Sequence, residues 1–145
     1  MLTKKQFSRS KVVNAPINAL WGVISKGDGV DQWLPFITTC RLEGEGENLK
    51  RYCTTADGKS LSETIDRIDH DRHEFDYSIY EQNMMPVENY QGRFALNEVG
   101  ESQTEITWSA TFDVSESDYP MIAESLEGFY EMGFEGLERL AAQEV

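Results

Sequence analysis

The chain has 145 residues, 39% of them hydrophobic, and carries a formal net charge of −13. A chain of this length most simply forms a single domain, here residues 1–145, and is long enough to bury a sizeable core. The negative charge argues against nucleic acid as a partner and against adsorption to anionic lipid.

Cysteine content and the amino-terminal residues bear on the compartment of the protein. The two cysteines, Cys40 and Cys53, are too few for a disulfide framework and are typical of a reducing cytoplasm. The first residues contain no apolar run, so we expect neither a signal peptide nor a membrane span. The sequence therefore predicts a cytoplasmic location.

The amino-terminal part of the chain predicts one strand and two short helices. Residues 5–13 favour a strand. Residues 14–16 then begin a helix, because proline is tolerated in a first turn, where its missing N–H would have no partner. Residues 30–34 favour a second short helix that ends before Pro35.

Residues 36–112 alternate between apolar and polar side chains, which is typical of an antiparallel sheet with one face in the core. An acidic, glycine-rich turn is expected at residues 43–47. A three-residue turn at residues 56–58 places Arg51 opposite Glu63 on the neighbouring strand. The predicted strands are residues 36–42, 49–55, 61–68, 73–80, 87–99 and 104–112.

Residues 118–142 predict one long helix, since apolar side chains recur at the helical spacing and glutamates occupy the opposite face. Gly128, Gly133 and Gly136 lie inside it, where each glycine costs about 0.5–1 kcal/mol relative to alanine. Two interpretations follow. Either the glycines allow the helix to pack closely on the sheet, or their missing side chains leave a hollow for a ligand.

These elements predict an α+β fold: a curved seven-stranded antiparallel sheet around a long carboxyl-terminal helix, with two short helices after the first strand. Such a wrap rarely closes tightly. The natural place for a ligand is the gap between the concave sheet and the helix.

Three segments of the chain resemble a known superfamily. Residues 14–16 before an Ile-x-x-x-Trp helix, residues 32–36, and residues 86–90 before a long strand resemble the helix-grip superfamily. This superfamily is also called START-like or SRPBCC, and includes polyketide cyclase/dehydrase and lipid transport domains. The resemblance implies a large hydrophobic cavity that binds lipids, polyketides or hormones, and only some members are enzymes.

Residues 35–40, 63–69 and 89–90 resemble pocket strands of the plant abscisic-acid receptors. Thr38 stands where those receptors keep a lysine for the hormone carboxylate, and residues 56–60 and 85–87 replace their gate and latch. The resemblance thus implies the pocket but neither abscisic acid nor the receptors' protein partner. By position, it implies that Thr38, Glu63, Tyr77, Ile79, Tyr90 and Gly136 line the pocket.

The polar residues expected to face inward are Arg51, Glu63 and Tyr90. Arg51 and Glu63 either orient the polar end of a ligand or form a structural ion pair at the cavity rim. Glu63 and Tyr90 are also candidate catalytic residues, as base and acid in an aldol-type cyclisation or dehydration. Arg51 is a third catalytic candidate.

The apolar wall of the cavity is expected to come from eight large side chains. Each of them, taken alone, also fits a plain core position. Met84 and Met85 form either an adaptable lid or a mobile surface loop. The eight residues are Trp33, Phe36, Tyr77, Ile79, Phe94, Trp108, Phe129 and Met132.

No motif predicts a metal or a cofactor. His70 and His73 lie in an acidic stretch but have no Cys or His partner pattern, and His70 is expected to be a solvated turn residue. Residues 44–48 lack the third glycine of a dinucleotide-binding loop. We therefore expect neither a metal site nor a cofactor.

The sequence leaves three functions open. The first is a binding or carrier protein for a small hydrophobic molecule. The second is an enzyme of the cyclase or dehydrase type. The third is an accessory module that forms a homodimer or binds a protein partner.

Overall fold

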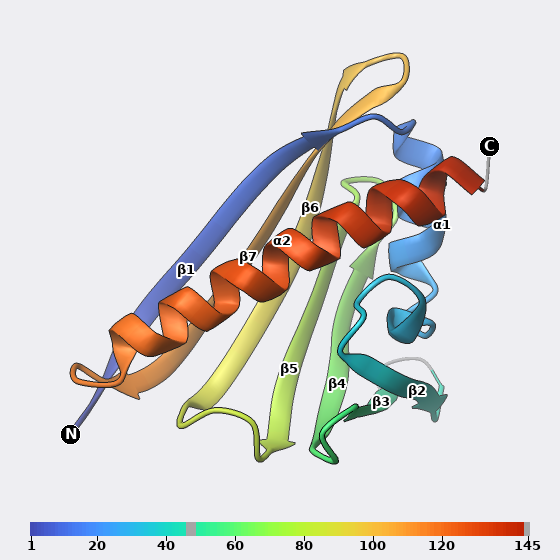
Figure 1. The fold of residues 1–145 in the computed structure, drawn as a ribbon. Helices are drawn as coiled ribbons and strands as arrows, with labels where there is room; N and C mark the ends of the chain where they lie inside the picture. Colours follow the sequence, from blue (N-terminus) through green and yellow to red (C-terminus); the bar gives the residue numbers. More distant parts are fainter. Residues whose placement is uncertain (46–48, 144–145) are drawn as a thin grey trace.

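The computed structural model describes residues 1–45 and 49–143 (Figure 1). The chain forms seven strands, two α-helices and one 3₁₀ turn within these ranges. In chain order the elements are β1 (Leu2–Val13), α1 (Ile17–Ser25), η1 (Val30–Gln32), β2 (Ile37–Glu43), β3 (Lys50–Thr55), β4 (Ser60–Asp69), β5 (Glu74–Gln82), β6 (Glu88–Gly100), β7 (Gln103–Ser115) and α2 (Tyr119–Gln143).

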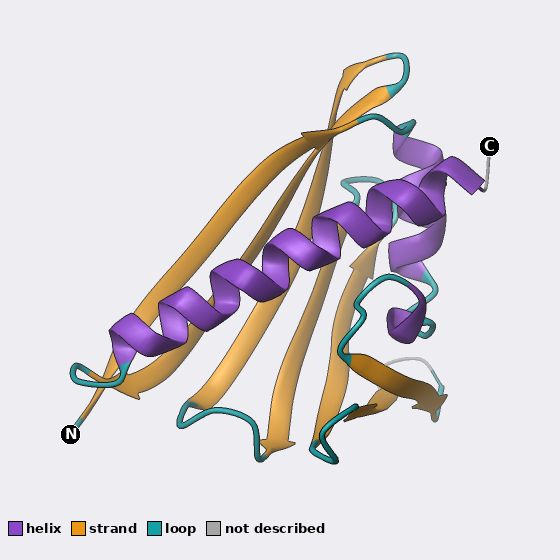
Figure 2. Cartoon of the chain, in the orientation of Figure 1, coloured by secondary structure: helices purple, strands orange, loops and turns teal. Residues whose placement is uncertain are grey.

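The seven strands form one antiparallel sheet in the order β1-β7-β6-β5-β4-β3-β2. The helix α2 runs diagonally across one face of this sheet, and α1 lies near the carboxyl-terminal end of α2 (Figures 1 and 2). The predicted helix-grip fold is confirmed. Neither helix of the described residues combines the length and the apolar character that crossing a membrane requires.

Two local features differ from the expectations. The second short helix is only a single 3₁₀ turn, η1, which follows Gly29 in the left-handed conformation (φ 75°). The last strand continues to Ser115, because Val114 pairs with Thr3 and keeps the inward alternation. The turn expected at residues 43–47 lies partly outside the described residues.

The core lies between the sheet and the inner face of α2. Ile122, Leu126, Phe134 and Leu137 of this face are almost completely buried. Burying each such side chain stabilises the fold by about 1.5–3 kcal/mol. At the middle of the helix, Tyr130 stacks on Trp108 of β7 with ring centroids 4.0 Å apart.

Two of the three glycines of α2, Gly133 and Gly136, serve close packing. A Cβ at Gly136 would lie 1.8 Å from the carbonyl oxygen of Trp33, and one at Gly133 would lie 2.6 Å from the Trp108 ring. Gly128 is exposed, with nothing within 4 Å of an added Cβ. The second interpretation, in which missing glycine side chains create the hollow, is therefore wrong at all three positions.

Candidate functional site

A cavity of about 80 Å³ lies between the sheet and α2. Its walls come from the segment around η1, from strands β2 to β7 and from α2. The loop between β5 and β6 contributes two methionines. The lining residues are Val30, Trp33, Leu34, Phe36, Ile37, Arg51, Cys53, Leu61, Glu63, Tyr77, Ile79, Met84, Met85, Tyr90, Phe94, Trp108, Leu126, Phe129 and Tyr130.

Most of the residues predicted for the site line this cavity. The structure brings together Trp33, Phe36, Arg51, Glu63, Tyr77, Ile79, Tyr90, Phe94, Trp108 and Phe129. It also places both lid candidates, Met84 and Met85, in the wall. These methionines are half-buried, and the side chain of Gln82 holds their loop. Its Nε2 donates to the carbonyl of Met85, and its Oε1 accepts from both methionine N–H groups.

Three predicted residues lie elsewhere. Thr38 is exposed, because the register of β2 shifts between Ile37 and Thr39 and the alternation breaks there; its hydroxyl lies 3.2 Å from the carbonyl oxygen of Thr54. Met132 is 37% exposed on the outer side of α2. Gly136 faces the backbone of Trp33 rather than the cavity. These three assignments were wrong.

The sequence interpretation missed several lining residues. Cys53 and Leu61 fit the inward alternation of their strands, which is a signal that could have identified them. Leu126 and Tyr130 lie on the apolar face of the helix predicted at residues 118–142, and that periodicity could have identified them. Val30 points inward because Gly29, in the left-handed conformation, turns the chain just before it. The spacing of apolar residues does not predict such a turn.

The polar part of the wall is centred on Arg51 and Glu63. The two residues are direct partners in the β3–β4 register, as predicted, and Arg51 Nε lies 2.7 Å from Glu63 Oε1. Arg51 Nη1 also donates to the carbonyl of Gly27, at 2.9 Å. Burial opposes the charge on Arg51, but the adjacent carboxylate outweighs this effect and raises the pKa of the guanidinium. Arg51 therefore keeps its charge inside the wall.

Three tyrosines add hydroxyl groups to the same wall. Trp108 Nε1 donates to the Tyr77 hydroxyl at 3.0 Å, and the hydroxyls of Tyr90 and Tyr130 are 3.0 Å apart. Burial raises the pKa of all three phenols above the usual value. They remain protonated at neutral pH, so they offer hydrogen bonds to a ligand but are poor proton donors for acid catalysis.

Six lining residues are only partly buried and form the rim of the cavity. At the rim, the rings of Phe36 and Phe129 approach with centroids 4.4 Å apart. Met84 and Met85 belong to this rim, and their unbranched side chains adapt readily to other shapes. We call Phe36, Leu61, Ile79, Met84, Met85 and Phe129 the rim residues.

The two histidines lie outside this site. His70 is exposed, as expected, but its Nδ1 accepts a hydrogen bond of 3.0 Å from the indole of Trp21. His73 packs edge-on against the same indole. Among residues 1–45 and 49–143, no group of three or more potential ligands is arranged to hold a metal ion.

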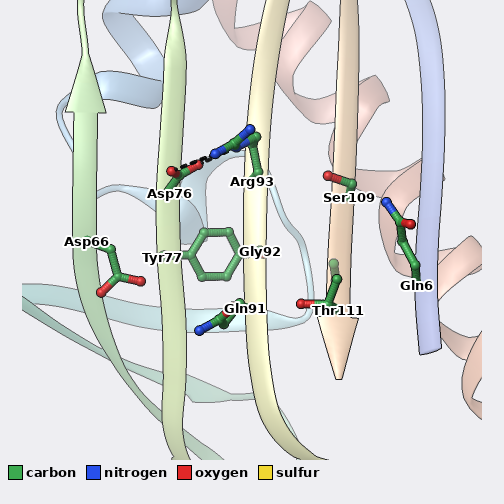
Figure 3. Close-up of a pocket in the computed structure, with 10 residues that line it drawn as sticks. Gln6, Asp66, Asp76, Tyr77, Gln91, Gly92, Arg93, Ser109 and Thr111 are labelled. Atoms are coloured by element: carbon green, nitrogen blue, oxygen red, sulfur yellow. Dashed lines mark hydrogen bonds and ion pairs between the residues drawn. The ribbon is translucent and has the colours of Figure 1, made fainter. Parts of the chain in front are cut away.

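A second hollow, of about 500 Å³, lies on the other face of the sheet (Figure 3). Polar side chains from neighbouring strands line it, among them Gln6, Gln91 and Thr111. Arg93 also lines it and pairs with Asp76 on the neighbouring strand, with hydrogen bonds of 2.6 and 3.0 Å (Figure 3). This polar, open surface does not suit a hydrophobic molecule.

Comparison with known proteins shows which family the chain matches. The family model described as polyketide cyclase / dehydrase and lipid transport matches residues 4–142. A search of curated proteins finds no match to this chain.

Several solved structures share the fold. The structure of XoxI from Bacillus cereus is 22% identical, with a TM-score of 0.83, and the alignment covers 92% of this chain and 93% of that one. A Thermobifida fusca protein is 18% identical, with a TM-score of 0.83 and coverage of 95% and 93%. Norcoclaurine synthase from Thalictrum flavum, solved with dopamine and hydroxybenzaldehyde, is 17% identical, with a TM-score of 0.77 and coverage of 98% and 88%. At these identities the likeness shows the fold.

Proposed function

The chain belongs to the polyketide cyclase/dehydrase and lipid transport family, and from that premise we propose that it binds a small hydrophobic molecule between the sheet and α2. The observation that carries the proposal is the cavity itself. Its wall is mostly apolar, with Arg51, Glu63 and three tyrosine hydroxyls gathered on one part of it. A few convergent polar groups in an apolar hollow are typical of small-molecule sites.

The size of the cavity sets a condition on binding. An apolar cavity of about 150 Å³ holds a benzene molecule, and drug-sized ligands occupy about 300–1,000 Å³. The 80 Å³ present here is smaller than either. A ligand must therefore displace the rim residues, and methionines 84 and 85 repack at low cost because their side chains are unbranched.

The polar groups favour a particular orientation of the ligand. Arg51 and Glu63 neutralise each other, so the pair selects no net charge. The hydroxyls of Tyr77, Tyr90 and Tyr130 donate or accept hydrogen bonds. We infer that the ligand places one uncharged polar end among these groups and its apolar body toward the rim.

A cavity-filling variant tests the proposal. Ile79→Trp fills the hollow from the rim, and Met132→Trp adds the same ring on the exposed side of α2 as a matched control. Binding of the fluorescent probe anilinonaphthalene sulfonate is measured by titration, and native mass spectrometry of freshly purified protein looks for a co-purified lipid-like mass. We expect both signals to be lost in Ile79→Trp only. Equal binding by the two variants would contradict a ligand site in this cavity.

An enzyme of the cyclase or dehydrase type is the second candidate. It is favoured by the presence of one carboxylate, Glu63, and one phenol, Tyr90, in the same wall. Burial raises the pKa of the Tyr90 phenol and makes it a poor proton donor, so Glu63, as a base, is the residue to test. Turnover of a model enone or polyketide substrate that is lost in Glu63→Gln, with probe binding retained, supports this candidate. Binding without turnover leaves the carrier function.

The dimerising module has less support. The large hydrophobic side chains that are exposed in the described part of the chain are spread over several elements, among them Val12 on β1, Tyr80 on β5 and Met121 on α2. A stable dimer needs a contiguous apolar surface.

A further inference from the structure

The two cysteines of the chain face each other across neighbouring strands. Cys40 of β2 and Cys53 of β3 are direct partners in the antiparallel register, and Cys53 Sγ donates a hydrogen bond of 2.7 Å to Cys40 Sγ. Directly opposite residues of such a pair have Cα atoms about 4.5–5.5 Å apart. A disulfide needs Cα atoms about 4.4–6.8 Å apart, so the two sulfurs can be joined with little backbone movement.

The surroundings of the two thiols differ in a way that assigns their roles. Cys40 is half-buried on the edge strand, whereas Cys53 is only 2% exposed and lines the cavity. The hydrogen bond from Cys53 lowers the pKa of Cys40, and Arg51 and the N–H of Val30 act in the same direction, against burial. The same hydrogen bond and burial raise the pKa of Cys53. Cys40 is thus the thiol that would first attack an external disulfide. Cys53 would then displace the group attached to Cys40 and form the intrachain bond.

We propose that Cys40 and Cys53 are a site of reversible oxidative modification, at which a small-molecule disulfide such as glutathione disulfide converts the two thiols into an intrachain disulfide.

The chemistry proceeds by two exchange steps. The Cys40 thiolate attacks one sulfur of glutathione disulfide, which breaks that S–S bond and releases one glutathione thiolate. Cys53 then loses its proton and attacks Cys40 Sγ, which forms the intrachain bond and releases the second glutathione. The two protein thiols are oxidised, and one glutathione disulfide is reduced to two glutathione molecules.

The bond would act at one of the two edges of the sheet. Within residues 1–45 and 49–143, β2 is an edge strand whose single partner is β3. Cys53 Sγ also lies 3.9 Å from Glu63 Oε1, so its oxidation removes an S–H group beside the Arg51–Glu63 pair. Oxidation therefore fixes the edge of the sheet and changes the polar wall of the cavity at the same time.

Equilibration of the full chain in glutathione buffers of increasing oxidising strength tests the site. After acid quenching, a maleimide labels the remaining thiols under denaturing conditions, and the intact mass is measured. We expect the folded chain to lose two hydrogens, to take no label, and to recover both thiols with dithiothreitol. The midpoint of thermal unfolding should rise by roughly 5–10 °C on oxidation, since the bond constrains the unfolded chain.

Single variants separate the roles of the two residues. In Cys53→Ser, we expect Cys40 to keep one glutathione adduct, because no second thiol resolves it. In Cys40→Ser, the buried Cys53 should stay reduced while the chain is folded. If wild type accumulates only a mixed disulfide, forms only disulfide-linked dimers, or keeps both thiols in the most oxidising buffer, the proposal is overturned. The wild-type mass alone decides this, whether or not the variants fold.

Discussion

Arg51 and Glu63 meet at 2.7 Å inside the wall of the cavity, with only 7% and 5% of their side chains exposed. Both ions have left water, and the attraction between them compensates the cost of desolvation only while both are present. Because Arg51 also holds the carbonyl of Gly27, the pair connects β3 and β4 to the loop before η1. The same pair therefore supports the fold and shapes the site.

Removal of one partner of this pair should cost more than removal of both. We expect Arg51→Met and Glu63→Leu each to lower the free energy of unfolding by about 3–5 kcal/mol, because the remaining ion is buried without compensation. The double variant should lose much less than the sum of the two. Urea unfolding of the four proteins measures the coupling. The exposed pair Arg41–Glu43 is the control, with an expected effect of about 0–1 kcal/mol. Strict additivity at Arg51 and Glu63 would contradict a coupled ion pair.

Alanine substitutions in α2 should have opposite effects at two glycines. Gly128→Ala should raise the free energy of unfolding by about 0.5–1 kcal/mol, because the site is open and alanine favours a helix. Gly136→Ala should lower it by about 3 kcal/mol or more, because the new methyl group would collide with the Trp33 carbonyl. Chemical denaturation of both variants checks the signs. A neutral Gly136→Ala would mean that helix and loop are not in contact.

Stability should fall steeply in alkaline solution. The folded-state pKa values of Tyr77, Tyr90 and Tyr130 lie above their unfolded value of about 10. Above that pH the unfolded chain binds fewer protons than the folded chain, so stability is full below about pH 10 and falls as pH rises, by about 1.4 kcal/mol per pH unit for each residue. When the urea midpoint of unfolding is plotted against pH in this range, it should fall less steeply for Tyr130→Phe than for wild type. A folded protein in which all six tyrosines ionise near the usual pH would refute the prediction.

Asp76 should contribute to the loss of stability in acid. Burial opposes its charge, but hydrogen bonds from Arg93 and Arg67 outweigh this and lower the pKa of the carboxyl. The resulting stability is present above the unfolded pKa of about 4 and is lost as pH falls through the lower folded value. We expect the free energy of unfolding of Asp76→Asn, measured by urea denaturation, to depend less on pH in the acid range than that of wild type. Asp71→Asn, in an exposed turn, is the control. Identical acid limbs in wild type and Asp76→Asn would exclude this role.

Much of the fold could be predicted because local signals agree with it. The three-residue turn at 56–58 places Arg51 opposite Glu63, and the structure shows this pairing and the neighbouring pair Cys53 and Leu61. The inward alternation of β5 and β7 placed Tyr77 and Trp108 correctly in the wall. Periodicity predicts which side chains point inward, and this largely determines the site.

Other features depend on contacts between distant segments. The bulge in β2 turns Thr38 outward, and no residue type in that strand predicts a bulge. The roles of Gly133 and Gly136 depend on Trp108 and Trp33, which come from segments far away in the chain. The volume of the hollow likewise follows from the packing of the whole set of wall residues, which one-dimensional spacing does not determine.

The contact between Gly136 and Trp33 also bears on how the ligand proposed above would enter the cavity. The helix rests on the backbone of Trp33, so the segment that carries Phe36 does not swing outward without lifting α2. We expect the proposed ligand to pass the β5–β6 loop instead, where the side-chain amide of Gln82 holds the backbone of Met84 and Met85. Stopped-flow release of a bound probe, faster in Gln82→Ala than in wild type, would reveal this route. The residence time of the ligand would then depend on Gln82, a side chain outside the lining of the cavity.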